Sequence, residues 1–215
     1  MSNHAPETKA RWDRLAKHYG LVEELSEWYL KPFRRILWAC AAGRILEAGA
    51  GTGLNIAFYP ARARVTATDL SGAMLRRARE RARERTVDAT FEEADLCHLP
   101  FAERTFDTAV ATFVFCSMPE PVTCLREMGR VTKPGGRILL LDHVRIESPL
   151  VGPLMDRLNS ATVRLAGEHI NHRMDEFVLE AGLEIVESRR LGFMGIIQFI
   201  VARPGKDRSQ EGEKA

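Results

Sequence analysis

Runs of apolar residues recur along most of the chain, at spacings that suit strands alternating with helices. They predict strands at 44–49, 65–70, 104–115, 135–144, 183–191 and 195–204. The early runs are almost continuous Ile, Leu, Val and Ala, which is typical of strands buried on both faces. The gaps between them leave room for crossover helices, so the pattern predicts an α/β fold with a Rossmann-like, doubly wound, mostly parallel sheet. The last two strands lie so close in sequence that they should form an antiparallel C-terminal hairpin.

Two segments fall outside this alternation. Trp12, Leu15, Ala16 and Tyr19 follow the spacing of one helical face, so residues 1–40 should form a helical cap. A second helical segment, 148–175, is inserted between two predicted strands of the domain at 41–205. Its apolar stripe from Leu150 to Leu165 is more often core, although it would also suit the wall of an acyl-chain groove. The polar tail, 206–215, has nothing to bury and should be disordered.

Composition limits the kinds of partner. The chain has 215 residues and a net charge of +2, so its overall charge does not call for a polyanionic partner. Its four cysteines have no metal-ligand spacing and the start of the chain resembles no leader, which indicates a reducing, cytoplasmic compartment. The longest apolar run, 193–202, is too short to span a bilayer.

A glycine-rich stretch follows the first predicted strand: Glu47, Gly49, Gly51 and Gly53 alternate with other residues. Leu54 stands where a dinucleotide fingerprint needs its third glycine, and the Glu47 carboxylate would repel a pyrophosphate. An amine-bearing ligand fits better. Asp69 ends the next strand, where it can accept hydrogen bonds from ribose hydroxyls, and Asp95 suits an adenine amine. A strand-to-helix turn without a ligand is the alternative, but it would not need these acids.

Together with "ADLCHLPF", "FDTAVATF" and "KPGG", this stretch resembles the class I S-adenosylmethionine-dependent methyltransferases, in register from Arg44 to Val144. The resemblance implies S-adenosyl-L-methionine as cofactor, S-adenosyl-L-homocysteine as product and no metal. It implies that the glycines approach the methionine part, that Glu47 supports it, and that Asp69 holds the ribose. The residues expected to complete the cofactor site are Leu70, Met74, Asp95, Leu96, Thr112 and Phe113.

Segments outside this core indicate an acceptor. "RWDRLAKHYG", "LLLDHVR", "GEHINHRMDEF" and "FMGIIQFIVARP" resemble the small bacterial phospholipid N-methyltransferases, which convert phosphatidylethanolamine to phosphatidylcholine. Related patterns occur in thiol and quinone methyltransferases, so a small hydrophobic acceptor is the alternative within this fold. A non-catalytic cofactor-binding regulatory module is the alternative from another class.

An ethanolamine ammonium has a pKa of about 10 and must lose its proton before it can attack a methyl group. The candidates for removing or orienting that proton are Tyr19, His143 and His169. His143 is favoured because strand ends face the ligand crevice in open α/β sheets; its alternative is a structural hydrogen bond. Arg145, His172 and Arg173 are the candidate substrate-binding residues, the arginines through a lipid phosphate. Two histidines three residues apart, without acids or cysteines nearby, do not predict a metal site.

The cap also carries basic and aromatic residues on its helices, as a helix lying on anionic lipid does. This predicts peripheral association with the inner face of the membrane; a lid packed on the sheet is the alternative. The signature for methylating nucleic-acid bases, (N/D)-P-P-(Y/F), is missing where "TFVFCSMPEP" stands, so a nucleic-acid partner is not expected. Nothing in the sequence specifies an oligomeric state.

Overall fold

The computed structural model describes residues 4–16, 19–166 and 169–205, without the side chains of residues 19–26 and 165–166. The tail at 206–215 and the side chain of Tyr19 therefore lie outside the described residues.

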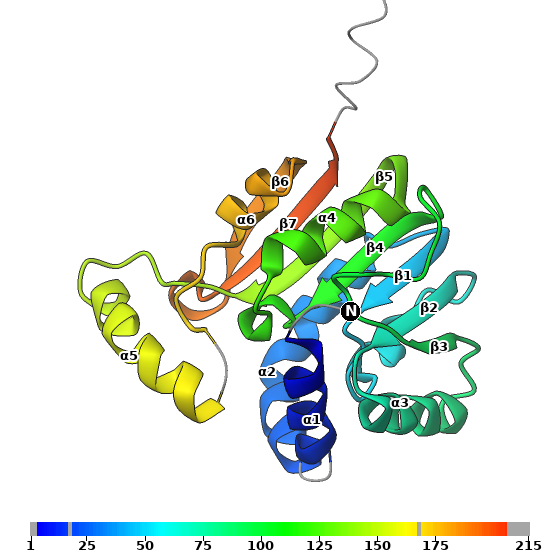
Figure 1. The fold of residues 1–215 in the computed structure, drawn as a ribbon, viewed down its shortest axis with the longest axis horizontal. Helices are drawn as coiled ribbons and strands as arrows, with labels where there is room; N and C mark the ends of the chain where they lie inside the picture. The colour runs from blue at the N-terminus through cyan, green and yellow to red at the C-terminus, as the bar shows by residue number, and fades with distance from the viewer. Residues whose placement is uncertain (1–3, 17–18, 167–168, 206–215) are drawn as a thin grey trace, which may run out of the picture.

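One seven-stranded sheet organises the chain, in the order β3-β2-β1-β4-β5-β7-β6 (Figure 1). The first five of these pair in parallel, whereas β7 runs antiparallel to both β5 and β6. The predicted α/β class and the C-terminal hairpin are thus confirmed. The strands are β1 (Arg44–Ala48), β2 (Arg64–Asp69), β3 (Thr90–Glu93), β4 (Phe106–Thr112), β5 (Thr132–His143), β6 (Leu183–Leu191) and β7 (Ile197–Pro204).

The strand β3 was not predicted from the sequence. It has only four residues, reads Thr-Phe-Glu-Glu, and none of its residues is fully buried. It pairs with β2 alone, at the edge of the sheet. An edge strand needs no long apolar run because solvent covers part of it, so the hydrophobic pattern that identifies central strands is absent here.

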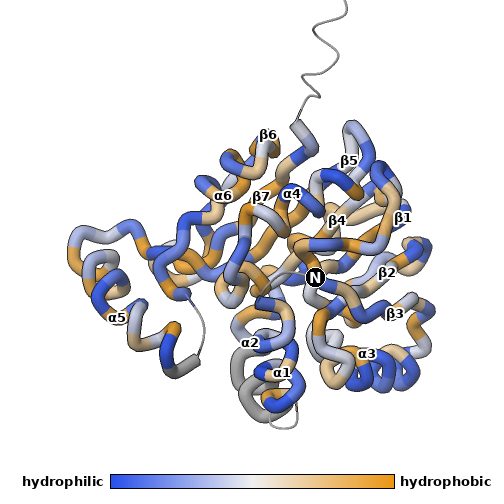
Figure 2. The backbone as a smooth tube through the Cα atoms, viewed as in Figure 1, coloured by the Kyte–Doolittle hydropathy of each residue, from blue (hydrophilic) through white to orange (hydrophobic). Residues whose placement is uncertain are grey.

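Helices flank the sheet and extend from it. They are α1 (Ala5–Leu15), α2 (Tyr19–Trp38), α3 (Gly72–Glu84), α4 (Pro121–Val131), α5 (Val151–Ala166) and α6 (Met174–Glu180), with short 3-10 turns η1 (Leu54–Phe58), η2 (Phe115–Ser117) and η3 (Phe193–Gly195). Figure 2 shows the contrast between the hydrophobic central strands and the hydrophilic α3.

The core has two layers because neighbouring residues of a strand face opposite sides of the sheet. On one side, Leu46 of β1 and Ile138 of β5 pack with α4 and α6. On the other, Ile45 packs with Leu37 and Trp38 of α2. The second N-terminal helix is therefore part of the core of the domain.

The insert behaves differently from a core helix. In Figure 1, α5 stands at one side of the molecule and covers neither face of the sheet. Leu150, just before it, is 82% exposed, and Leu154 and Leu158 are 55% and 49% exposed. Among the described side chains of the predicted stripe, only Met155 is buried. The leucines in the first half of that stripe are thus exposed to solvent, whereas the stripe was predicted to be part of the hydrophobic core.

The packing of α2 can be tested by comparing two neighbouring residues of that helix. Leu37 is fully buried against the sheet, whereas Ile36 is 44% exposed. We expect Leu37→Ala to lower the free energy of unfolding by about 2–5 kcal/mol, because it removes buried methyl groups and leaves a cavity. Ile36→Ala should lower it by less than about 1 kcal/mol. Urea unfolding followed by circular dichroism measures both; equal losses would mean that α2 does not dock as described.

Candidate functional site

A pocket opens where β1, β2 and β4 end, at their carboxyl edge. Its wall includes residues that end or follow these strands: Gly49, Gly51, Asp69, Leu70, Thr112 and Phe113. Parallel strands bring their carboxyl ends to one edge of a sheet, which is why residues distant in sequence meet here. Met74, Asp95 and Leu96 also line the pocket. Of the residues expected to bind the cofactor, all but Glu47 and Gly53 line this pocket.

The three glycines after β1 have different surroundings. All three have positive φ angles, at 74°, 56° and 84° for Gly49, Gly51 and Gly53. A Cβ on Gly49 would come within 2.5 Å of Val114, and one on Gly53 within 3.0 Å of the α3 backbone at Ala78. A Cβ on Gly51 would meet nothing within 4 Å. Gly49 and Gly53 therefore allow close packing inside the protein, while Gly51 leaves open space on the side of the pocket.

Asp69 holds the loop in place. One carboxylate oxygen accepts from the Gly51 amide and the other from the Ser71 amide, each at 2.8 Å. Burial raises the pKa of Asp69, although these two amide donors oppose the shift. A carboxylate offers about four acceptor positions, so two remain for a ligand in the pocket.

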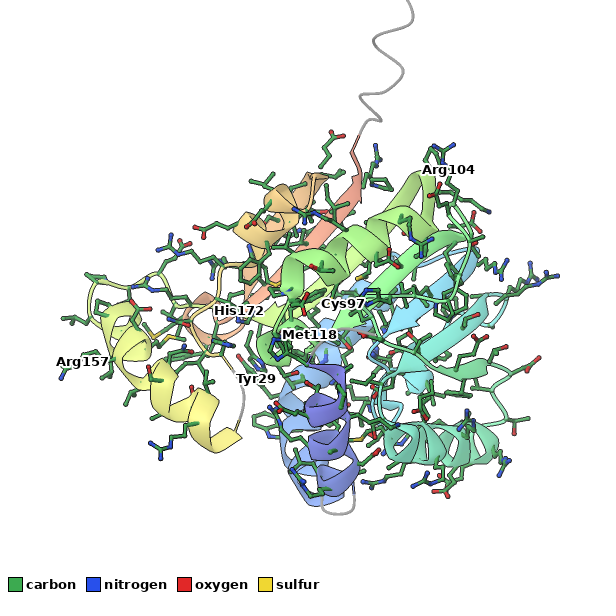
Figure 3. All side chains as sticks on the ribbon, in the orientation of Figure 1. Tyr29, Cys97, Arg104, Met118, Arg157 and His172 are labelled. Atoms are coloured by element: carbon green, nitrogen blue, oxygen red, sulfur yellow. A yellow bond between two sulfur atoms is a disulfide. The ribbon has the colours of Figure 1, made fainter. Side chains whose placement is uncertain are left out.

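Asp95 lies beyond the edge strand β3 and is 8% exposed. One of its oxygens accepts from the Cys97 amide at 3.0 Å, and the His98 ring lies 3.6 Å from the other. Cys97 is itself in the pocket wall, at the centre of Figure 3 together with Met118.

The cysteine spacing predicted a reducing compartment, and the structure departs from that expectation because it joins two of the cysteines. Cys97 and Cys124 form a disulfide, while Cys40 and Cys116 are free. The bridge ties the segment after Asp95 to α4. Its partners are 27 residues apart in sequence, so only the fold brings them together.

The segment after β4 forms the opposite wall. Phe113 has a φ of 57°, a backbone conformation that residues other than glycine rarely adopt. The buried Asp142 of β5 fixes the next two residues, since it accepts from the amides of Val114 and Phe115. Burial raises the pKa of Asp142 to about 7, against the lowering effect of hydrogen bonds that include those from the Phe115 and His143 amides. Backbone strain of this kind is stored where the surrounding structure enforces it, often at a functional site.

Glu47 lies behind the pocket. Its carboxylate accepts hydrogen bonds from the Asn55 amide and the Tyr59 hydroxyl, and its side chain is buried. Desolvation by burial raises the pKa of Glu47 to about 7, although both donors oppose the shift. Its hydrogen-bond partner Asn55 does line the pocket.

Arg34 of α2 reaches the same network and was not among the predicted site residues. Its Nη1 donates to Asn55 and Thr112, both at 2.9 Å, and the residue lines the pocket. The sequence does contain a signal for this residue. Arg34 stands on the stripe formed by Leu30, Leu37 and Trp38, where a charged residue is unexpected unless it has a polar function.

The helix α1 closes the pocket from another side, with Thr8 and Trp12 in its wall. Polar contacts attach this helix to the domain. The Lys9 ammonium donates to Glu93 and to the Leu70 carbonyl, and Asp13 accepts from the Ser71 hydroxyl.

The three histidine candidates lie in different surroundings. His143, at the end of β5, is half-buried and its ring contacts the Phe113 ring at 4.7 Å between centroids. Burial and then the Arg34 charge lower the pKa of His143. His169 is exposed, with its ring 3.3 Å from the Asn159 amide. His172 is 7% exposed, stacks on Phe177, and has its pKa lowered to about 4, chiefly by burial.

The candidate arginines lie on the insert side. The Arg145 guanidinium pairs with Asp156 of α5 at 2.9 Å and thereby anchors that helix. Arg173 is exposed and pairs with Glu176 at 3.0 Å. None of the described candidates for catalysis and substrate binding lines the pocket itself, but the His143 ring contacts the pocket-wall residue Phe113, with the two rings tilted by 41°. The side chain of Tyr19 lies outside the described residues.

The described residues show neither a metal-binding cluster nor a membrane-spanning helix. No three His, Cys, Asp or Glu side chains gather among them as a metal site requires. None of the helices described combines the length and the apolar character needed to cross a bilayer.

The pocket fits S-adenosylmethionine chemically. Apolar side chains of Leu70, Met74 and Leu96 suit a purine ring, and the two aspartates offer acceptors for hydroxyl and amine donors. The open space at Gly51 allows a ligand to approach the backbone. This cofactor brings an activated methyl group; the chain has to orient the acceptor and exclude water.

Comparison with known proteins agrees with this site. A family described as "Methyltransferase domain" matches residues 46–140. A phosphatidylethanolamine N-methyltransferase of Cereibacter sphaeroides is 34% identical over 161 residues, covering 74% of this chain and 78% of that protein. A ubiquinone/menaquinone biosynthesis C-methyltransferase, UbiE, of Bdellovibrio bacteriovorus is 33% identical over 165 residues, covering 72% and 70%.

Among solved structures, the [4+2]-cyclase SpnF superposes with a TM-score of 0.66 at 22% identity, over 82% of this chain and 80% of that one. This likeness concerns the fold alone. The two relatives, together with the matched methyltransferase domain, show that the chain belongs to the class I S-adenosylmethionine-dependent methyltransferases.

Proposed function

We propose that this methyltransferase methylates the amine of phosphatidylethanolamine and of its methylated derivatives, towards phosphatidylcholine. The observation that carries the proposal is an exposed surface of basic and aromatic side chains on α2 and the β6–β7 turn. The similarity to the Cereibacter sphaeroides enzyme supports the same acceptor. We infer that the protein acts in the cytoplasm, at the inner face of the membrane.

The surface, which we call the basic–aromatic face, consists of Trp28, Lys31, Arg35, Ile36, Phe193 and Met194. Trp28 and Phe193 are 78% and 76% exposed, far more than aromatic side chains usually are in water. The two lie near each other because the Phe193 amide donates to the hydroxyl of Tyr29 at 2.8 Å. Exposed aromatic rings among basic residues favour an interface with anionic lipid.

The insert adds apolar area. Leu154 and Leu158 are four residues apart on α5, so they share one face, and both are exposed, as is Leu150 just before the helix. Arg157 of the same helix extends away from the body of the protein (Figure 3). Leucines at this spacing with a neighbouring arginine suit contact with acyl chains below a layer of headgroups.

The acceptor amine must lose a proton, and His143 is the residue proposed to accept it. An ethanolamine ammonium, with a pKa of about 10, holds its proton at neutral pH. Because its own pKa is lowered, His143 is neutral there and offers a ring nitrogen that can take this proton. The freed amine lone pair then attacks the activated methyl group, and the imidazole passes its proton to water.

Methylation of a quinone precursor at carbon is the second candidate. Several relatives are described as UbiE, including those of Bdellovibrio bacteriovorus and Syntrophotalea carbinolica at 33% and 36% identity. Both reactions use the same methyl donor, so the cofactor pocket does not discriminate between them. A non-catalytic regulatory module is the third candidate, and it would bind cofactor without transferring a methyl group to any acceptor.

The roles of the pocket residues belong to the same proposal. We assign the ribose hydroxyls to Asp69 and the adenine amine to Asp95, with Leu70, Met74 and Leu96 around the purine. Thr112 and Phe113 then border the methionine end, where Glu47 acts through Asn55.

Changing Asp69 should test the ribose assignment. We expect Asp69→Ala to weaken binding of S-adenosylhomocysteine about 100-fold, because hydrogen bonds to a charged acceptor contribute about 1.5–3 kcal/mol. Isothermal titration calorimetry measures the affinity, and the exposed Asp88→Ala serves as control. Unchanged affinity in Asp69→Ala would refute the role.

The acceptor can be tested with vesicles of phosphatidylethanolamine and phosphatidylglycerol. Labelled S-adenosylmethionine should yield mono-, di- and trimethylated headgroups, identified by mass. Trp28→Ala with Phe193→Ala should lower vesicle binding at least about 10-fold, since each ring contributes about 1.5–3 kcal/mol when buried. The matched control is Leu179→Ala, an apolar residue of α6 that is 61% exposed. Intact cofactor binding without any lipid product would favour the quinone acceptor instead.

His143→Ala tests the proton acceptor. Turnover should fall about 100-fold or more, as for loss of a general base, with the affinity for S-adenosylhomocysteine unchanged. In the unaltered enzyme turnover should rise with pH through a pKa below the usual 6.5, because burial favours the neutral, active imidazole. The variant should lack that rise. Full turnover in the variant would make the histidine structural.

A further inference from the structure

The disulfide joins two parts of the wall of the cofactor pocket. Cys97 belongs to the turn that presents Asp95, and its amide donates to the Asp95 carboxylate at 3.0 Å. Cys124 lies in the first turn of α4, directly after the pocket-wall segment 117–120. The bridge therefore connects the turn at the adenine end of the pocket with the segment that leads into α4.

Other contacts hold the chain after this turn to α4 without the bridge. The Leu99 amide donates to Glu127 at 2.9 Å, and the Arg130 guanidinium donates to the Leu99 and Phe101 carbonyls at 3.0 and 2.8 Å. None of these four residues lines the pocket, and α4 also packs on the sheet through buried core residues. Breaking the bridge should therefore loosen the turn beside the pocket and leave the fold intact.

The two cysteines differ in how far they can be reached. Cys97 is 5% exposed and belongs to the pocket wall, whereas Cys124 is completely buried. A thiol reagent therefore meets the pair at Cys97 first. Because the adjacent Asp95 is assigned to the adenine amine, a bound cofactor covers Cys97, and the redox state of the pair is linked to occupation of the pocket.

We propose that Cys97 and Cys124 form a reversible redox switch that sets the affinity for the cofactor. A reducing compartment keeps the pair as two thiols, and the bridge forms when the glutathione pool becomes oxidised. In the bridged protein the turn is fixed before a ligand arrives, whereas in the dithiol form it has to be ordered on binding, which lowers affinity. The switch rests on the proposed cofactor site and is independent of the acceptor, whether lipid or quinone.

The exchange needs only a low-molecular-weight disulfide. The Cys97 thiolate attacks one sulfur of glutathione disulfide and releases a glutathione thiolate. The Cys124 thiolate then attacks the Cys97 sulfur of the mixed disulfide, which forms the bridge and releases the second glutathione. The protein thiols give up two electrons and two protons, and glutathione disulfide takes them up to become two glutathione thiols. Excess glutathione reverses both steps.

The unaltered protein can be compared after equilibration with glutathione disulfide and after treatment with dithiothreitol. Thiol titration in denaturant should detect all four cysteines in the reduced form, but only Cys40 and Cys116 in the bridged form. Isothermal titration calorimetry should show about 10-fold tighter binding of S-adenosylhomocysteine by the bridged form. Circular dichroism should be the same for both forms.

The same ligand should protect the bridge. At about 100 times its Kd, S-adenosylhomocysteine should slow reduction of the bridge by dithiothreitol at least about 10-fold, because few pockets remain empty. An unchanged rate of reduction would contradict the link between the bridge and the pocket.

Cys124→Ser should have the affinity of the reduced form under both conditions. The matched control is Cys40→Ser, a cysteine of the chain outside the pocket wall, which should keep the difference between the two forms. If Cys124→Ser fails to fold, the two forms of the unaltered protein still decide the matter. Equal affinities, failure of glutathione disulfide to form the bridge, or unfolding on reduction would each overturn the switch. Absence of S-adenosylhomocysteine binding in both forms would instead refute the cofactor site, and the switch with it.

Discussion

The site depends on the burial of parallel strands on both of their faces. β1 pairs in register with β2 on one side and β4 on the other, so that Glu47 stands opposite both Ala67 and Val110. The interior positions of such strands face packed helices and are mostly apolar, so the polar groups that a ligand can reach gather where the strands end. The carboxyl ends of β1, β2, β3 and β4 and the loops after them therefore hold the glycines, the aspartates and Phe113 at one edge, although these residues are far apart in sequence.

The central strands and most residues that line the cofactor pocket could be predicted from the sequence because their signals are local. Apolar runs identify β1, β4 and β5, and an acid directly after a strand identifies Asp69. The spacing of the glycines did not show, however, that the three have different structural roles. Their roles differ because a Cβ would meet Val114 at Gly49 and Ala78 at Gly53, but only open space at Gly51.

The features that the sequence did not predict depend on contacts between distant segments. Arg34 gains its surroundings from residues 21 and 78 positions away along the chain. Cys97 and Cys124 meet only because α4 packs beside the segment after β3. The exposure of the α5 leucines results from where that helix sits and not from its periodicity, since a helix with one apolar face has the same pattern whether that face meets the core or a membrane.

The attachment of α1 has a kinetic consequence. This helix covers the pocket with Thr8 and Trp12, yet its only described buried residues within the helix and at its end are Ala5 and Ala16. Polar contacts to Leu70, Ser71 and Glu93 hold it instead. Segments with little buried apolar area open locally at a small fraction of the cost of global unfolding. Release of α1 would therefore open the pocket while α2 and the sheet remain packed, and the rate of cofactor exchange would then be set separately from the stability of the domain.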